Sequence, residues 1–275
     1  MKVTISSCLM SLFCGMVFLS STSPALAQGT AQKFEPGNFP GLMVDEVVVP
    51  VPSEIFSVLD KLGDPNWKDE LRKPVVPTEA DRMELSLIFG SIIAEGFVAV
   101  QAQDKQAVED IGRDVIKLSK SLGLSKAVSP HAQSILDAVK NENWKGVRKE
   151  LDQTQSTVRA EMDRMHDNDL AQCVSLGGWL RGTASVTSVV GKAYTEDRAE
   201  LLNQPLLVAY FSKAVNSMSE SAKGNTLISA VSKGLTKIHQ AMESKDGTFT
   251  PEKISTIHST CEDLLSLILQ TKKAK

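Results

Sequence analysis

The sequence lacks a surplus of positive charge. Its 275 residues include 30 Lys and Arg against 33 Asp and Glu, which gives a formal net charge of -3. Proteins that bind nucleic acids neutralise phosphates with an excess of basic side chains. We therefore expect no nucleic acid among the main partners of this protein.

Glycine and proline are also scarce. The 17 Gly and 11 Pro are too few for a collagen-like or low-complexity chain, and a hydrophobic content of 42% is too high for general disorder. From Ser53 onward the apolar residues follow helical spacings, with no convincing strand pattern. The sequence predicts an all-α fold, with one compact multi-helix domain over residues 53–273.

Established catalytic motifs are missing as well. The chain has no Gly-x-Ser-x-Gly, no His-Glu-x-x-His, no Walker loop and no Gly-x-Gly-x-x-Gly, and we expect no cofactor. The acids Glu79, Asp81 and Glu84 lie at the start of a long helix, where the helix dipole alone favours acids. Together with Glu95 they leave open a carboxylate-dependent hydrolase of unrecognised type.

A metal site is not expected either. Asp163, His166 and Asp167 share one helix face at spacings of three and four residues, which is a geometry that metal ligands use. However, no recognised zinc pattern surrounds them. A charged, solvated helix end is the favoured interpretation.

The amino terminus has the three parts of a secretory signal peptide. Lys2 supplies a positive start, a mostly apolar run follows up to Leu19, and Ala25-Leu26-Ala27 forms a small-x-small cleavage site. The apolar run is shorter than the roughly 20 residues that cross a bilayer. We expect residues 1–27 to be removed after Ala27, with export to the periplasm or secretion. No later segment is long and apolar enough to span a membrane without a charge, so we expect no transmembrane segment in the mature chain.

Export would also change the cysteine content. Cys8 and Cys14 leave with the signal peptide, whereas Cys173 and Cys261 remain. In an oxidising compartment these two residues could form a disulfide. Because both lie in apolar helical patterns, two buried free thiols are the alternative.

Residues 28–52 form a leader rich in proline and glycine. Val47-Val48-Val49 has the composition of a short strand, but Pro50 and Pro52 favour an extended arm instead. We expect this leader to be extended or partly disordered.

Self-comparison of the sequence indicates an internal duplication. The segment Leu59–Lys68 aligns without gaps with Leu136–Lys145, and five positions are identical, including Trp67 and Trp144. Each Trp should lie one position into a helix and pack against the preceding helix. The repeat predicts two similar units, about 53–128 and 129–218, followed by a helical hairpin over 224–273. Chance similarity between generic helices is the alternative.

Each predicted unit contains one long helix with a single internal charge. Glu95 is the only charge from Leu85 to Gln103, and Arg181 is the only charge from Ala171 to Gly191. An unpaired charge on a buried helix costs several kcal/mol. We therefore predict that the two helices pack together and that Glu95 and Arg181 form a structural ion pair.

Small residues allow a close approach of these two helices. Gly178 and Gly182 lie four residues apart on one helix face, as do Gly90 and Ala94 on the other helix. Glycine inside a helix costs up to about 1 kcal/mol relative to alanine, so its repeated use indicates a packing requirement.

Three functions remain possible at this point. The first is an exported, non-enzymatic binding or scaffolding module of the cell envelope with a protein partner of unknown identity. The second is a small-ligand carrier or sensor whose pocket between the two apolar helices is lined by Glu95, Arg181 and Trp179. In that pocket, the guanidinium of Arg181 would bind a carboxylate or phosphate. The third is the hydrolase.

Overall fold

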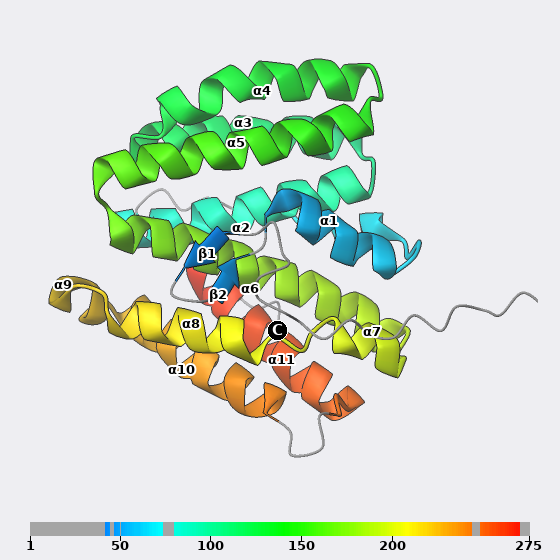
Figure 1. Cartoon of the computed structure of the whole chain (residues 1–275), viewed down its shortest axis with the longest axis vertical. Coiled ribbons are helices and arrows are strands. Elements are labelled where there is room, and N and C mark those ends of the chain that lie inside the picture. Colours follow the sequence, from blue (N-terminus) through cyan, green and yellow to red (C-terminus); the bar gives the residue numbers. More distant parts are fainter. Residues whose placement is uncertain (1–41, 45–46, 50, 74–79, 244–247, 270–275) are drawn as a thin grey trace, which may run out of the picture. The chain divides into compact units, whose positions relative to one another are not determined.

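The computed structural model describes residues 42–44, 47–49, 51–73, 80–243 and 248–269 (Figure 1). All of them belong to one of two compact units of the chain, Pro36–Lys275. The expected signal peptide, residues 1–27, and the first part of the leader lie outside the described residues.

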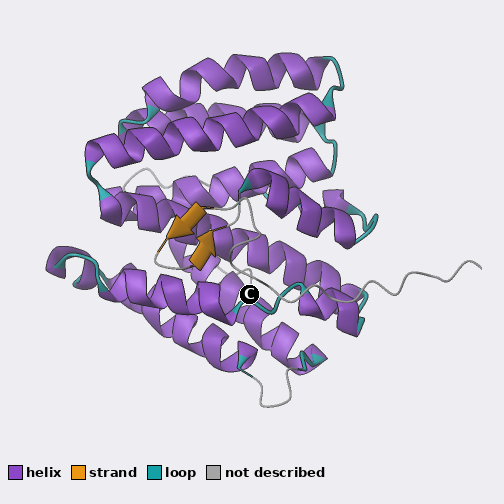
Figure 2. Cartoon of the chain, viewed as in Figure 1, coloured by secondary structure: helices purple, strands orange, loops and turns teal. Residues whose placement is uncertain are grey.

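The described part of the chain has an all-α fold (Figure 2). In chain order, the helices are α1 (Pro52–Lys61), the 3-10 helix η2 (Trp67–Glu70), α2 (Arg82–Gln101), α3 (Lys105–Leu122), α4 (Ser125–Lys140), α5 (Trp144–Met165), α6 (Asn168–Lys192), α7 (Glu196–Glu200), α8 (Pro205–Asn216), α9 (Glu220–Lys223), α10 (Thr226–Met242) and α11 (Pro251–Ile268).

Helices α2 and α6 pack against each other in the middle of the fold. The side chains of α2 are buried almost all round from Ser86 to Val100, as expected for a helix without a polar face. Among the described residues, α2 is the helix with the length and apolar composition of a membrane span, and 67% of its most apolar window is buried inside the fold.

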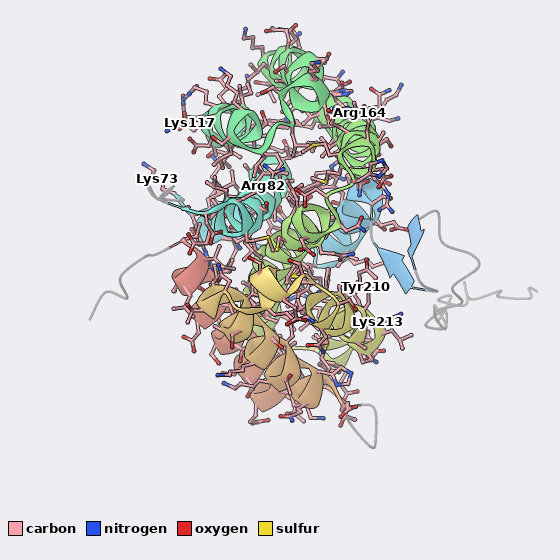
Figure 3. All side chains as sticks on the ribbon, turned by 90° about the vertical axis from the view of Figure 1, so that its left-hand side faces the viewer. Lys73, Arg82, Lys117, Arg164, Tyr210 and Lys213 are labelled. Carbon is pink, nitrogen blue, oxygen red and sulfur yellow. The ribbon has the colours of Figure 1, made fainter. Side chains whose placement is uncertain are left out.

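Other helices cover this central pair on two sides. Helices α3, α4 and α5 lie on one side, with α3 packed against α2, while α8, α10 and α11 lie on the other side, with α11 packed against α6 (Figure 1). Figure 3 shows these layers nearly along the helix axes. The central pair is therefore buried between two groups of surface helices.

Glycines let the backbones of α2 and α6 touch. A methyl group added at Gly90 would lie 1.9 Å from the carbonyl oxygen of Val174, and one added at Gly177 would lie 2.1 Å from that of Leu87. The predicted close approach of the two helices is confirmed at Gly90 and Gly178. A methyl group added at Gly178 would lie 3.4 Å from the carbonyl oxygen of Gly90. The prediction is wrong for Gly182, because a methyl group added there would meet no atom within 4 Å. Gly177, one residue from Gly178, makes the tighter contact.

Polar side chains cap the first turn of many described helices. The side chains of Asp104, Asn143, Thr195 and Thr250 each accept a hydrogen bond from a backbone N–H in the first turn of the helix that follows. Such a bond satisfies a backbone donor that has no partner within the helix. Because the cap acts locally, these starts are readable from the sequence.

Two prolines lie at different positions within their helices. Pro205 is the first residue of α8, and the chain before it forms the separate helix α7. At that position the missing N–H of proline has no helical partner to lose. Pro130, in contrast, lies inside α4, five residues after the first residue of that helix, Ser125.

The described part of the leader contains a short strand pair, although the prolines around Val47–Val49 favoured an extended arm over a strand. Val47–Val49 (β2) forms an antiparallel ladder with Leu42–Val44 (β1), with Val44 opposite Val47. The ladder ends at Val49, so the prolines that argued against a strand fall outside it. Strand β2 packs against α8.

The structure does not confirm two similar units. Trp67 is buried and begins a 3-10 helix of 4 residues, whereas Trp144 is half-buried and begins the 22 residues of α5. The preceding turns also differ, because the left-handed residue is Gly63 in the first and Glu142 in the second. The two segments share a sequence pattern but not a local structure.

Candidate functional site

The structure brings Glu95 and Arg181 together in the core. Glu95 lies on α2 and Arg181 on α6, with residue exposures of 2% and 1%. The Arg181 Nε donates to the Glu95 Oε2 at 2.5 Å. The two lone charges of the apolar helices therefore neutralise each other inside the fold.

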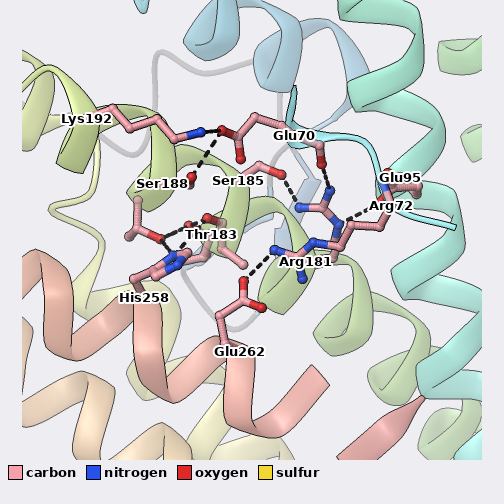
Figure 4. Close-up of polar contacts among 12 residues, drawn as sticks. Glu70, Arg72, Glu95, Arg181, Thr183, Ser185, Ser188, Lys192, His258 and Glu262 are labelled. Carbon is pink, nitrogen blue, oxygen red and sulfur yellow. Dashed lines mark hydrogen bonds and ion pairs between the residues drawn. The ribbon is translucent and has the colours of Figure 1, made fainter. Parts of the chain in front are cut away.

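The remaining polar atoms of this pair bind the backbone of residues 70–72. The Glu95 Oε1 accepts a hydrogen bond from the Arg72 N–H at 2.5 Å, and the Arg181 Nη2 donates to the Glu70 carbonyl at 2.6 Å (Figure 4). The Arg181 Nη1 donates to the hydroxyl of Ser185, one turn further along α6. The pair thus holds the 70–72 segment as well as the two helices.

The side chains of the 70–72 segment reach two helices. The Glu70 Oε1 accepts hydrogen bonds from Ser188 at 3.0 Å and from the Lys192 ammonium at 2.5 Å, both on α6. The Arg72 Nη2 donates to the Glu262 carboxylate on α11 at 2.5 Å. The segment is therefore fixed to α2, α6 and α11 by side chains and backbone together.

These contacts leave the central pair no free face for a ligand. Arg181 uses Nε, Nη1 and Nη2 for protein acceptors, and both Glu95 oxygens accept protein donors. A buried polar network with all its members satisfied rigidifies a core, whereas a partly satisfied one is costly. The pair is built as a structural element.

Trp179 lies outside this network. Its Nε1 donates to Gln204 at 3.3 Å, and its ring lies 5.4 Å from that of Phe211 on α8. Two residues along a helix correspond to about 200° of rotation, so Trp179 and Arg181 leave α6 on nearly opposite sides. Trp179 therefore points away from Glu95 and Arg181, the two residues with which it would line the alternative ligand pocket.

Cys173 and Cys261 are both buried and free, so the possible disulfide is absent from this structure. Cys173 lies eight residues before Arg181, or about 12 Å along α6. Cys261 precedes Glu262, which Arg72 links to the network around Arg181. The two thiols are therefore held at different levels of the core.

We predict that both thiols are unreactive in the folded protein. Burial raises the pKa of Cys173 to about 12 and also raises that of Cys261, so almost no thiolate exists at neutral pH. Iodoacetamide should modify both only after denaturation, measured by peptide mass. The exposed control Ser57→Cys should react at once in the native protein. Rapid native modification of Cys173 or Cys261 would contradict the buried positions.

The acids proposed for a hydrolase serve to start α2. Asp81 accepts a hydrogen bond from the Glu84 N–H at 2.9 Å, and Glu84 accepts one from the Asp81 N–H at 3.1 Å. This reciprocal arrangement is a capping box. Glu79 lies outside the described residues, and Glu95 is engaged in the core. Of the described acids, Asp81, Glu84 and Glu95 are absent from the lining of the two hollows described below.

One histidine bridges a carboxylate and a hydroxyl on the surface. The His131 Nδ1 lies 2.7 Å from the Glu150 Oε1, and its Nε2 lies 3.0 Å from the Thr157 Oγ1. This order resembles a nucleophilic triad. However, the Thr157 hydroxyl also donates to the Gln153 carbonyl. The surrounding α5 N–H groups bond within the helix, which leaves them unsuited to stabilise an oxyanion.

Asp163, His166 and Asp167 also have structural positions rather than a shared ligand position. His166 ends α5 in a left-handed conformation, and Asp167 caps α6 through the Leu170 N–H. Within the described ranges, no three His, Cys, Asp or Glu side chains are placed to hold a metal ion.

In two surface hollows of the described residues, the lining contains none of Glu95, Arg181 and Trp179. The shallower one lies where Arg148 stacks on Phe56, 4.4 Å from the ring centre, and hydrogen bonds to Asp60. The bond from Arg148 holds the pKa of the Asp60 carboxyl below its usual value. Both carboxylate oxygens of Asp60 and both terminal nitrogens of Arg148 are bound within the protein, so this hollow offers little to a charged ligand.

The second hollow is more enclosed and contains Glu70. We call it the Glu70 hollow; it has a volume of about 300 Å³. Its lining consists of Asp64, Pro65, Asn66, Asp69, Glu70, Val189, Lys192, Ala193 and Arg198. Arg181 holds the Glu70 carbonyl from inside the core, so the buried network fixes one wall of this hollow.

The polar residues of the Glu70 hollow were not identified in the sequence. A signal for them exists on α6, since Arg181, Ser185, Ser188 and Lys192 follow one another at spacings of four, three and four residues. Such spacings place side chains on one helix face. Glu70 and Arg72 carry no comparable pattern, because they lie in and just after a short 3-10 helix.

In comparisons with known proteins, no family model, no curated protein and no solved structure matches this chain.

Proposed function

We propose that this chain is an exported helical binding protein of the cell envelope, without catalytic activity. The observation that carries the proposal is the contrast between buried and surface charges. Glu95 and Arg181 are fully engaged by protein groups. The charged groups of the Glu70 hollow, in contrast, keep open positions next to a concave surface. Binding sites combine a concave surface with a few fixed polar groups.

Export is part of this proposal and is supported by the amino-terminal sequence. The apolar run and the Ala25-Leu26-Ala27 motif are typical of a cleaved secretory signal. A buried polar network adds rigidity to a protein that has no disulfide among its described residues.

A photo-crosslinking experiment tests both parts of the proposal. Cells produce the full chain with benzoylphenylalanine in place of Asp69, which is exposed at the rim of the hollow. Gln153, exposed on α5, serves as the matched control position. We expect the chain from the exported fraction to begin at Gln28 and to carry a light-dependent adduct at position 69 but not at 153. A chain kept inside the cell with Met1, or equal adducts at both positions, would refute the proposal.

A further inference from the structure

The Glu70 hollow has walls of opposite charge. Its acidic wall comes from the connection between α1 and η2 and from η2 itself, with Asp64, Asp69 and Glu70. Its basic wall comes from the end of α6 and from α7, with Lys192 and Arg198. The sequence separates these walls by more than a hundred residues. The packing of η2 against α2 and the hydrogen bonds from Ser188 and Lys192 on α6 to Glu70 bring them together.

The acidic wall has acceptors that no protein donor satisfies. Glu70 is only 6% exposed, yet both its hydrogen bonds from Ser188 and Lys192 go to the Oε1 atom. Within the described residues, no hydrogen bond reaches its Oε2, nor the carboxylates of Asp64 and Asp69. The Glu70 Oε2 is not among the buried side-chain atoms that lack a partner, so it is open to the hollow and can accept a hydrogen bond from a charged donor there.

The basic wall has hydrogen-bond donors that protein acceptors do not use up. The Lys192 ammonium donates to Glu70, but its side chain is 62% exposed and an ammonium has three donors. The Arg198 Nη1 donates to the Ala193 carbonyl, whereas its Nη2 has no acceptor in the described part of the chain. Both cations can therefore bind an anionic group at the hollow.

We propose that the Glu70 hollow binds an α-amino acid zwitterion with an aliphatic side chain. This proposal deepens the proposed binding function and rests on it. The ammonium of the ligand donates to the Glu70 Oε2 and is attracted by Asp64 and Asp69. The carboxylate of the ligand accepts from Lys192 and Arg198. Because ammonium and carboxylate share one carbon in such a ligand, their spacing suits the adjacent charges of Glu70 and Lys192.

A zwitterion fits this lining better than an ion of either sign. A simple anion meets three carboxylates, and a simple cation meets Lys192 and Arg198. A zwitterion places each of its charges beside an opposite charge of the hollow. The apolar surface of Pro65, Val189 and Ala193 remains for an aliphatic side chain. The volume of about 300 Å³ is at the lower end of small-ligand sites.

Calorimetric titration of the purified protein with L-leucine tests the proposal. N-acetyl-L-leucine lacks the ammonium, and L-leucinamide lacks the carboxylate. We expect saturable binding of leucine and at least about tenfold weaker binding of either derivative, because each loses charge-assisted hydrogen bonds. No leucine binding at millimolar concentration, or equal binding of all three compounds, would overturn the proposal.

Substitutions of residues that line the Glu70 hollow test whether leucine binds there. Glu70→Gln and Lys192→Met should each weaken leucine binding by about tenfold or more. Lys192 is mostly exposed, so its variant should keep the wild-type fold, which circular dichroism checks. Lys145→Met, exposed on α5, is the matched control and should bind as the wild type does. Unchanged binding in Lys192→Met would overturn the assignment.

The two proposals fail in different ways. An adduct at position 69 without leucine binding would leave a binding protein with another ligand, and the zwitterion would be wrong. No position-specific adduct and no leucine binding would remove both proposals.

Discussion

Gly177→Ala should destabilise the protein by about 3 kcal/mol, which is the upper end of the usual range for overpacked cores. The added methyl would lie 2.1 Å from the Leu87 carbonyl oxygen, which belongs to the backbone of α2 and cannot turn away. The two central helices must then separate, and the contacts along both are weakened. Gly90→Ala should behave alike, because its methyl would meet the Val174 carbonyl. The free energy of unfolding in urea measures the effect.

Gly182→Ala and Gly112→Ala are the matched controls for this prediction. Both glycines lie within helices, in α6 and α3, and an added methyl at either position meets no atom within 4 Å. Alanine is the better helix former by up to about 1 kcal/mol, so both variants should be as stable as the wild type or more stable. A large loss in Gly182→Ala, or no loss in Gly177→Ala, would contradict the packing described for α2 and α6.

Arg181→Met should destabilise the protein by about 3–5 kcal/mol, the cost of breaking a buried ion pair by removal of one partner. It leaves the Glu95 carboxylate buried with one donor, the Arg72 N–H, and leaves the Glu70 carbonyl without its Arg181 donor. Glu95→Leu should cost a similar amount, since it leaves a buried guanidinium without its carboxylate. Thermal or urea unfolding provides the measurement.

The double variant Glu95→Leu/Arg181→Met measures how strongly the two side chains interact with each other. Because no buried charge remains, its loss of stability should be smaller than the sum of the two single losses. Arg164→Met is the matched control, because Arg164 pairs with Glu161 in an exposed i,i+3 contact on α5 and should change stability little. Additive effects of Glu95→Leu and Arg181→Met would show that the two side chains do not interact.

Local signals account for what the sequence predicted correctly. The all-α class follows from the helical spacing of apolar residues, and the start of α2 follows from Asp81 and Glu84, which cap it within one turn. The meeting of Glu95 and Arg181 follows from energetics, because a lone charge in an apolar helix needs a partner. None of these inferences requires knowledge of the tertiary structure.

What the sequence did not predict depends on rotation and on distant contacts. Gly177 and Gly178 differ by about 100° around α6, and only the tertiary packing decides which of them touches α2. Trp179 was grouped with Arg181 by proximity in sequence, although the helix turns them apart. The roles of Glu70 and Arg72 arise from contacts with α6 and α11, more than a hundred residues away.

The central claim is that the buried pair Glu95 and Arg181 holds the 70–72 segment in place. Amide hydrogen exchange of the unmodified protein tests this claim directly, because the Arg72 N–H donates to the Glu95 Oε1 at 2.5 Å. We predict that the Arg72 amide exchanges as slowly as buried amides of α2 such as that of Phe89, while the exposed neighbour Lys73 exchanges rapidly. Equally rapid exchange at Arg72 and Lys73 would contradict the claim.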